Sequence, residues 1–138
     1  TAIVLGETGG ALSPLVLLAK VGLGGKQGNG DQFFSWVHVQ DFVRALDFIQ
    51  EHSEIVGTIN IAAPNPVKNR LVMKILRNAL RIPFGIPAPK WLLKIGAVLI
   101  KTETELILKS RNVIPGKLNK LSFEFNFPTL AQAIQNLV

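Results

Sequence analysis

The chain of 138 residues is 48% hydrophobic, contains no cysteine and no tyrosine, and carries a formal net charge of +6. This length fits one domain with a sizeable core, and the composition disfavours disorder of the whole chain. A disulfide scaffold, a cysteine nucleophile and a tyrosine acid or base within this chain are excluded. The two histidines, His38 and His52, cannot alone complete the usual zinc site, so we predict no metal.

The chain begins with Thr1 followed directly by an apolar run, so we expect it to be a fragment of a longer protein. Residues 2–25 lack the basic start of a secretory signal and include Glu7 and Pro14. The apolar residues 91–100 are too few to cross a membrane, which takes roughly 20 residues. We therefore predict a cytoplasmic protein without a membrane span.

The first third of the chain alternates between strand and helix patterns. Residues 2–5 form a continuous apolar run, which predicts a buried strand of a parallel sheet. Pro14, with Ser13 as its N-cap, predicts a helix that ends near residue 21. Five glycines within residues 22–30 predict a loop or turn. Aromatic and β-branched residues over 32–39 then predict one strand.

The middle of the chain continues this alternation. Asp41 is the predicted N-cap of a helix whose apolar residues recur at helical spacing up to residue 49. A short strand is predicted over 57–62, and the following prolines break it. Apolar residues at helical spacing then predict a helix over 72–81.

The sequence pattern of the last part of the chain predicts mainly helix. We predict a helix over 91–100 and a second one from the capping box at 102–105 to about residue 111. Three phenylalanines alternate with polar residues over 123–127, which predicts a half-buried strand. Pro128 and Thr129 begin the last predicted helix.

The positive charge is concentrated in one stretch, because residues 66–120 carry twelve basic and two acidic residues. Such a stretch can meet nucleic acid, an anionic membrane or an acidic partner. No aromatic residues alternate with the basic ones as a base-stacking surface requires. A solvated helical surface is therefore the favoured interpretation.

Several residues allow both a chemical and a structural interpretation. The glycines of residues 22–30 could cradle a phosphate, but their spacing fits no nucleotide fingerprint and favours a turn. His38 near Asp41 could act as a general base, but no nucleophile accompanies them, so a buried structural histidine and a helix cap are favoured. Asn65, held between two prolines, could bind a ligand or cap a loop.

Four stretches that occur in this order together resemble a known family. They are Gly28-Asn29-Gly30-Asp31-Gln32, Trp36-Val37-His38-Val39-Gln40-Asp41, residues 60–69 with their Ala-Pro-Asn-Pro-Val run, and Val113-Ile114-Pro115 with the Phe123-Glu124-Phe125 alternation. The chain resembles, over nearly its whole length, the C-terminal half of epimerase family proteins with a DUF1731 domain. These are atypical extended short-chain dehydrogenases/reductases, some of which are labelled cell-division inhibitors.

The resemblance implies an α/β fold, namely the C-terminal part of a Rossmann-type protein with a remnant of its parallel sheet and a helix-rich substrate-side domain. Residues 1–21 would be a late strand and helix of the Rossmann-type domain. Residues 22–138 would be the substrate-side domain, DUF1731-like from about residue 85. NAD(P) would bind the longer parent, and none is expected for this chain alone, because the cofactor loop and the catalytic tyrosine and lysine would lie outside it.

The resemblance also implies a site. Gln32, Trp36, His38 and Asn65 would bind a sugar-like or carbonyl substrate, and Gly6 and Glu7 would lie near the cofactor. No catalytic residue is assigned within this chain.

Three functions follow as hypotheses. The first is the substrate-binding portion of an NAD(P)-dependent nucleotide-sugar epimerase, dehydratase or reductase, inactive by itself. The second is a non-catalytic module for dimerisation or protein interaction, and the third a basic nucleic-acid-binding domain. We also expect a homo-oligomer, because residues 2–5 and 15–18 would expose apolar surface outside the parent.

Overall fold

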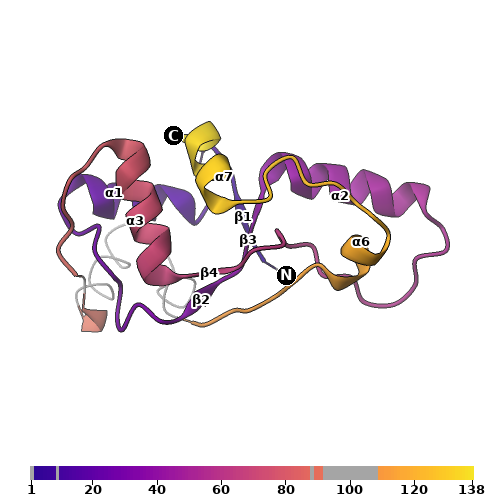
Figure 1. Ribbon diagram of the computed structural model, residues 1–138, viewed down its shortest axis with the longest axis horizontal. Helices are drawn as coiled ribbons and strands as arrows, with labels where there is room; N and C mark the ends of the chain where they lie inside the picture. Colours follow the sequence, from indigo (N-terminus) through magenta and orange to yellow (C-terminus); the bar gives the residue numbers. More distant parts are fainter. Residues whose placement is uncertain (1, 9, 88, 92–108) are drawn as a thin grey trace.

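The computed structural model describes residues 2–8, 10–87, 89–91 and 109–138 (Figure 1). The described part is a mixed α/β fold with a short parallel sheet and helices, which confirms the predicted fold class. The two helices predicted over 91–100 and 102–111 lie mostly outside the described residues. Ser110 and Arg111 are described and are not helical, so the second predicted helix cannot extend to residue 111.

A parallel pair of strands forms the centre of the molecule. Strand β1 (Ile3–Leu5) pairs with strand β3 (Trp36–His38), and Leu5 lies opposite His38 at their carboxyl ends. The apolar run at the start of the chain is therefore a strand of a parallel sheet, as predicted. Helix α1 (Leu12–Lys20) follows β1 along the chain.

Helix α1 begins two residues before Pro14. Its N-cap is Ala11, which makes no side-chain cap hydrogen bond, so the prediction of Ser13 as N-cap is wrong. Pro14 is tolerated inside the helix because the first four N–H groups of any helix have no intrahelical partner.

The single strand predicted over 32–39 is divided into two. Strand β2 (Phe33–Phe34) pairs antiparallel with strand β4 (Val67–Lys68), which the sequence did not predict, whereas β3 joins β1. Ser35 separates them, and its hydroxyl donates to the carbonyl of Arg111 and accepts from the amide of Val113. The chain changes sheets at Ser35 because its side chain is engaged by a distant segment.

Two other predicted strands are absent from the described residues. Residues 57–62 form no strand, and the nearest link to the sheet is the amide of Ala63, which donates to the carbonyl of Trp36 at 2.7 Å. Residues 123–127 are also not a strand. Their alternation reflects ring packing: Phe123 meets Phe48 edge-on at 5.3 Å, and Phe127 stacks on His38.

Four further helices complete the described elements. They are α2 (Val39–Glu51), α3 (Asn69–Leu80), α6 (Gly116–Lys120) and α7 (Leu130–Leu137). Helix α3 ends at Arg81 in the left-handed conformation, and α7 begins with the capping box of Thr129 and Gln132. The end of α3 and the start of α7 agree with the prediction, whereas α6 was not predicted.

The N-cap of α2 is His38 rather than Asp41. Asp41 lies in the first turn of the helix and is fully buried. Its carboxylate accepts from the amides of Asn126 and Phe127 at 2.9 and 2.8 Å. The prediction of Asp41 as N-cap is wrong because its carboxylate accepts hydrogen bonds from the backbone of a segment 85 positions away. A local sequence pattern cannot show such a distant contact.

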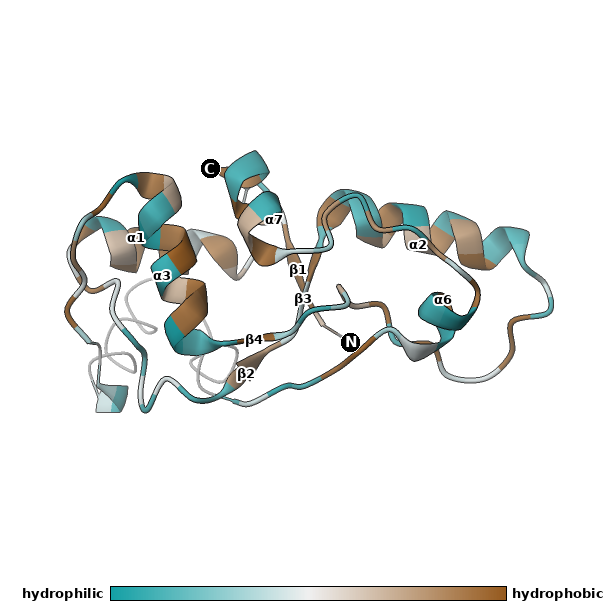
Figure 2. Cartoon of the chain, viewed as in Figure 1, coloured by the Kyte–Doolittle hydropathy of each residue, from teal (hydrophilic) through white to brown (hydrophobic). Residues whose placement is uncertain are grey.

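Apolar side chains form two clusters. Helices α1, α3 and α7 close over β1 and β2 around Trp36, Met73 and Ile134, whereas α2 and α6 pack around Val37 and Leu118. Figure 1 shows the first group of helices on one side of the central strands and α2 with α6 on the other, and Figure 2 shows how apolar and polar residues alternate along them.

Residues 2–5 and 15–18 are less exposed than expected, and Ile3, Val4, Val16 and Leu18 are half-buried. Ala2, Leu5 and Leu15 are buried, and Leu17 is the one that is clearly exposed, at 46%. Among the described residues, no helix is long and apolar enough to cross a membrane. In the same part of the chain, no group of three acidic or histidine side chains could hold a metal ion.

Candidate functional site

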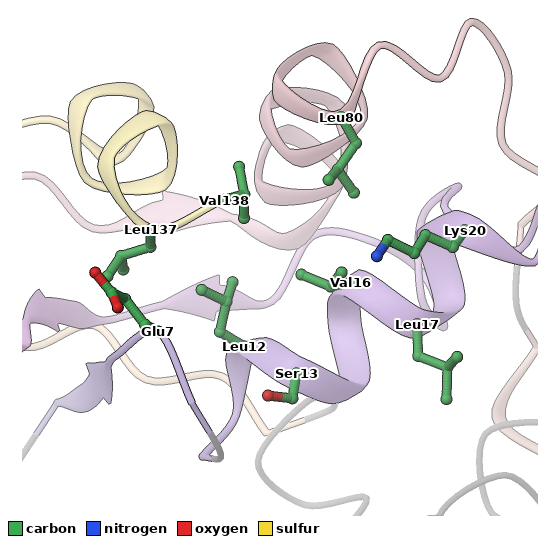
Figure 3. Close-up of a pocket in the computed structure, with 9 residues that line it drawn as sticks. All are labelled: Glu7, Leu12, Ser13, Val16, Leu17, Lys20, Leu80, Leu137 and Val138. Carbon is green, nitrogen blue, oxygen red and sulfur yellow. The ribbon is translucent and has the colours of Figure 1, made fainter.

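The carboxyl ends of β1 and β3 lie next to a hollow. In open parallel sheets, ligands bind outside the carboxyl ends of the strands. Gly6 and Glu7 follow β1 directly, and Glu7 lines a hollow of about 400 Å³ between α1, α3 and α7 (Figure 3). The two residues predicted to lie near the cofactor are therefore at the edge of the sheet where a ligand would approach.

His38 ends β3, but both of its ring nitrogens are used within the fold. Nδ1 accepts from the amide of Gln40 at 3.1 Å, so Nε2 carries the hydrogen and donates to the Asn136 side chain at 3.0 Å. The ring is 1% exposed and stacks on Phe127 with centroids 3.9 Å apart. This geometry matches the structural interpretation of His38 and leaves no ring nitrogen for a general base.

Trp36 and Asn65 are brought together by the fold. The indole N–H of Trp36 donates to the carbonyl of Asn65 at 3.0 Å, and the Asn65 side chain donates to the carbonyl of Pro128 at 2.8 Å. Trp36 is fully buried, whereas Asn65 is exposed. Together they fix β3, the proline loop and the start of α7 relative to one another.

Gln32 lines a second, more polar hollow of about 320 Å³. Its other lining residues come from the glycine-rich loop and from residues far along the chain: Gly28, Asn29, Asp31, Lys90 and Ser110. The sequence analysis missed Lys90 and Ser110, because nothing in their local pattern shows that they approach residues 28–32. Of the four predicted substrate residues, Gln32 is the one that lines a described hollow.

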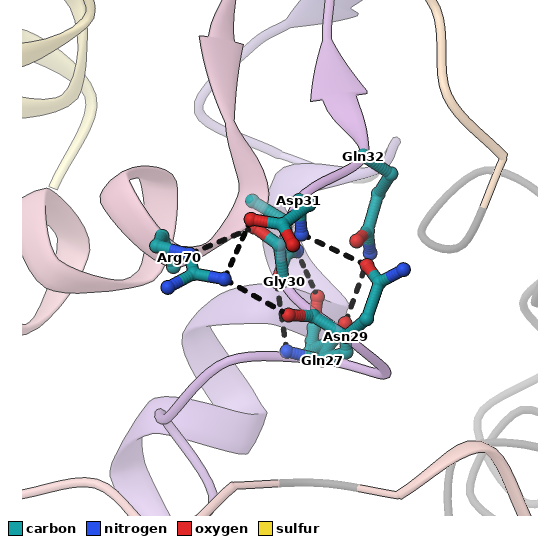
Figure 4. A network of polar contacts seen from close by, with 7 residues as sticks. Gln27, Asn29, Gly30, Asp31, Gln32 and Arg70 are labelled. Atoms are coloured by element: carbon teal, nitrogen blue, oxygen red, sulfur yellow. Dashed lines mark hydrogen bonds and ion pairs between the residues drawn. The ribbon is translucent and has the colours of Figure 1, made fainter.

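Buried amides hold Gln32 in place (Figure 4). Its Nε2 donates to the carbonyl of Gln27 at 3.0 Å. Gln27 and Asn69 are both buried and form two hydrogen bonds with each other. The backbone N–H of Gln27 donates to Asn69 Oδ1 at 2.7 Å, and Asn69 Nδ2 donates to Gln27 Oε1 at 2.8 Å. These hydrogen bonds connect the glycine-rich loop to the start of α3 and hold Gln32 in one wall of the polar hollow.

An ion pair connects the outer side of the glycine-rich loop to α3. Arg70 pairs with Asp31 at 2.6 Å and donates to the carbonyl of Asn29 at 3.2 Å. Both charged side chains are more than half exposed, so this pair contributes little to stability. It neutralises the carboxylate of Asp31 at the rim of the polar hollow, where Lys90 supplies a positive charge.

The glycine-rich loop does not present a phosphate cradle. The amide of Gly25 donates to the carbonyl of Ile86 at 3.2 Å, and the amide of Gly30 donates to that of Gln27 at 3.1 Å. Gly28 and Gly30 have positive φ, as tight turns require. The amides of Gly22, Leu23 and Gln27 also donate to acceptors inside the fold, which agrees with the turn interpretation.

The chain is similar to known proteins over almost its whole length. A family model described as "Domain of unknown function (DUF1731)" covers residues 88–137. An epimerase family protein of Staphylococcus epidermidis is 36% identical over 136 residues, which are 99% of this chain and 44% of the relative.

Two solved structures show the same similarity. The human epimerase family protein SDR39U1, solved with NADPH, has a TM-score of 0.85 and 30% identity over 99% of this chain and 45% of its own. The nucleoside-diphosphate sugar epimerase from Corynebacterium glutamicum has a TM-score of 0.69 and 31% identity over 99% of this chain and 25% of its own. These matches confirm the resemblance drawn from the sequence motifs. The chain spans less than half the length of the curated relative.

Proposed function

Since the chain is similar over 99% of its length to epimerase family proteins of the extended short-chain dehydrogenase/reductase fold, we propose that it is the substrate-side portion of an NAD(P)-dependent, nucleotide-sugar epimerase-like oxidoreductase. Residues 1–21 contribute a late strand and helix of the Rossmann-type domain, and residues 22–138 form the substrate side. The observation that carries this proposal is the match to the human relative solved with NADPH.

The cofactor binds the longer protein rather than this chain alone. Several amides of the glycine-rich loop donate to acceptors inside the fold, which supports a turn rather than a dinucleotide site. The chain also has no tyrosine, so a tyrosine base has to come from elsewhere. Gly6 and Glu7, at the carboxyl end of β1, form the part of this chain that lies beside the cofactor. When bound, NAD(P) supplies the hydride acceptor or donor.

The polar hollow beside Gln32 receives the substrate. Amide, hydroxyl and ammonium groups of Asn29, Ser110 and Lys90 surround it, and such groups orient a hydroxyl-rich ligand by hydrogen bonding. Trp36, His38 and Asn65 hydrogen-bond within the fold and join β3, the proline loop and α7. They are positioning residues for the substrate.

The basic segment favours this proposal over nucleic-acid binding. Arg70 is engaged by Asp31, and Arg77 donates to the carbonyl of Gly24 at 2.8 Å. Two of the cations of α3 therefore serve the fold instead of forming a free phosphate-binding row.

Calorimetric titration of the intact parent protein with UDP-glucose, and separately with NADPH, tests the proposal. Gln32→Ala should weaken UDP-glucose binding about tenfold or more, since it removes a polar wall group, and leave the affinity for NADPH unchanged. Gln135→Ala is the matched control, because this glutamine is exposed on α7. Equal binding of UDP-glucose by both variants, or binding of NADPH by the 138-residue chain alone, would overturn the assignment.

A further inference from the structure

The polar hollow beside Gln32 offers hydrogen-bond donors that nothing in the described part of the chain accepts. The side-chain oxygen of Asn29 accepts from the amide of Asp31 at 2.9 Å (Figure 4), which identifies the other end of the Asn29 side chain as its NH2 group. That NH2 group donates to no described residue. The hydroxyl of Ser110 accepts from the amide of Phe33 at 3.0 Å and, within the same part of the chain, donates to no acceptor. Two neutral donors of the lining are therefore open to a ligand.

Lys90 adds a positive charge to this lining. Among the described residues, the ion pairs join Arg44 to Asp41 and Arg70 to Asp31, and Lys90 takes part in neither. Asp31 is the other charged residue of the lining, and its pairing with Arg70 at 2.6 Å compensates its charge. The hollow and its rim therefore carry one positive charge that has no counter-charge in the described structure.

The acceptors of the lining, by contrast, are largely occupied. One oxygen of Asp31 accepts from Arg70, the side-chain oxygen of Asn29 accepts from a backbone amide, and the carbonyl of Asn29 accepts from Arg70 at 3.2 Å. A sugar hydroxyl both donates and accepts, whereas an ionised phosphate or carboxylate only accepts. A lining of open donors beside an ammonium group therefore suits an oxyanion better than an uncharged polyol.

We propose that this hollow binds one singly charged oxyanion of the substrate and that Lys90 is the residue that determines specificity for it, with Asn29 and Ser110 as neutral donors. The volume of about 320 Å³ lies at the small end of the range for ligand sites, which is about 300–1,000 Å³. The hollow therefore suits one part of a nucleotide sugar. The inference rests on the proposed function, and it narrows the ligand at this position from a hydroxyl-rich group to a negatively charged one.

A nucleotide sugar can supply this chemistry from two sources. One is a phosphate of the diphosphate bridge, and the other is a carboxylate on the sugar ring. Both present oxygens that only accept hydrogen bonds, so the lining described above fits either of them. The two sources are distinguished by ligands that share the diphosphate and differ in the carboxylate.

Calorimetric titration of the intact parent protein with inorganic diphosphate tests the oxyanion site directly. The protein is first saturated with NADPH, so that the phosphate contacts of the cofactor are already occupied. Lys90→Met should weaken diphosphate binding about tenfold or more, because it removes the charge and keeps a side chain of similar shape. Lys90→Arg should retain most of the affinity. Lys120→Met is the matched control and should bind like the unsubstituted protein, since Lys120 is exposed on α6.

Asn29→Asp provides a second variant that acts on a neighbouring group. It keeps an oxygen that accepts from the amide of Asp31 and replaces the NH2 donor by a charged oxygen, so diphosphate binding should fall at least as far as in Lys90→Met. Asn119→Asp, at an exposed position of α6, is its control. Added sodium chloride should weaken diphosphate binding more in the unsubstituted protein than in Lys90→Met, which a purely structural role of Lys90 would not produce.

Titration of the same variants with UDP-glucose and UDP-glucuronate identifies the source of the oxyanion. An equal loss for both ligands in Lys90→Met places the diphosphate in the hollow, and a loss for UDP-glucuronate alone places the sugar carboxylate there. Unchanged affinity of Lys90→Met for diphosphate and for both nucleotide sugars would overturn the inference, while a Gln32→Ala variant that still loses UDP-glucose would leave the proposed function intact. Diphosphate binding that depends on Lys90 without any binding of UDP-glucose or UDP-glucuronate would instead support the oxyanion site and overturn the proposed function.

Discussion

Replacement of Gly85 by alanine should destabilise the chain through a direct clash between two loops. A Cβ at this position would lie 2.5 Å from the carbonyl carbon of Gly24 and 2.6 Å from both the nitrogen of Gly25 and Nη1 of Arg77. Carbon atoms normally approach no closer than about 3.5 Å, so the backbone at residues 24–25 has to move by about 1 Å. Gly85 has no positive φ, so the expected effect is steric rather than conformational.

The magnitude follows from what that movement disturbs. Overpacking of a tight contact costs about 1–3 kcal/mol. The shift also strains the 3.2 Å bond from the amide of Gly25 to the carbonyl of Ile86 and the 2.8 Å bond from Arg77 to the carbonyl of Gly24, each worth about 0.5–1.5 kcal/mol. We therefore expect Gly85→Ala to lower the free energy of unfolding by about 2–4 kcal/mol, a large part of the stability of a typical domain.

Urea unfolding monitored by circular dichroism measures this loss, and Gly116→Ala is its matched control. Gly116 begins α6, and nothing lies within 4 Å of a Cβ placed there. Alanine at this position should leave the free energy of unfolding unchanged or raise it by up to about 1 kcal/mol. The steric argument would be refuted if the free energy of unfolding of Gly85→Ala lay within about 0.5 kcal/mol of that of the unsubstituted chain, or if both variants lost the same amount.

Three further substitutions distinguish buried from exposed polar contacts, each measured by the same unfolding assay. Asp41→Asn should lower the free energy of unfolding by about 2–4 kcal/mol, because a buried carboxylate that accepts from two amides of the 126–127 segment is lost; a change below about 0.5 kcal/mol would contradict its role. Thr129→Ala removes the capping box of α7 and should cost about 1 kcal/mol, and an unchanged unfolding midpoint would show that the cap is dispensable. Asp31→Asn, by contrast, breaks an exposed ion pair with Arg70 and should change stability by less than about 0.5 kcal/mol; a loss several times larger would be inconsistent with exposed pairing.

Local pattern predicted the elements whose ends are set by neighbouring residues. The apolar periodicity of α3 and the start of α7 beside Pro128 and Thr129 agree with the prediction, since both are determined within a few positions of the sequence. The same holds for β1, whose continuous apolar run reflects burial in a parallel pair.

The failures share a different cause, which is contact between distant segments. Ser35 interrupts a strand because the segment around Arg111 engages its hydroxyl. Asp41 does not cap α2 because the backbone near Asn126 takes its carboxylate. In each case a short polar side chain has two possible partners, and the one chosen lies more than seventy positions away, beyond the reach of any window of sequence.

The polar hollow was only partly predictable for the same reason. Gln32 was predicted from the resemblance, but Lys90 and Ser110, which line the same 320 Å³ hollow, were not. The amide of Phe33 donates to the hydroxyl of Ser110 at 3.0 Å, which brings that segment beside β2. No spacing along the chain between Gln32 and these residues could have shown that they meet.

The motifs that marked the family lie in two different places in this structure: residues 28–32 supply four of the six residues that line the polar hollow, whereas Trp36 and His38 lie in the core. Trp36 and His38 are buried, and their side chains bond to Asn65 and Asn136, which lie 29 and 98 positions away, so they join β3 to the proline loop and α7. A buried, fully bonded residue fixes the shape of a wall but cannot tell one ligand from another at its surface. Under the proposed function, discrimination between substrates falls to groups that face the open space, here Asn29, Lys90 and Ser110. Because Lys90 and Ser110 lie outside the motifs, two proteins with the same motifs can differ in the lining of this hollow, and the proposed function predicts that their substrates then differ.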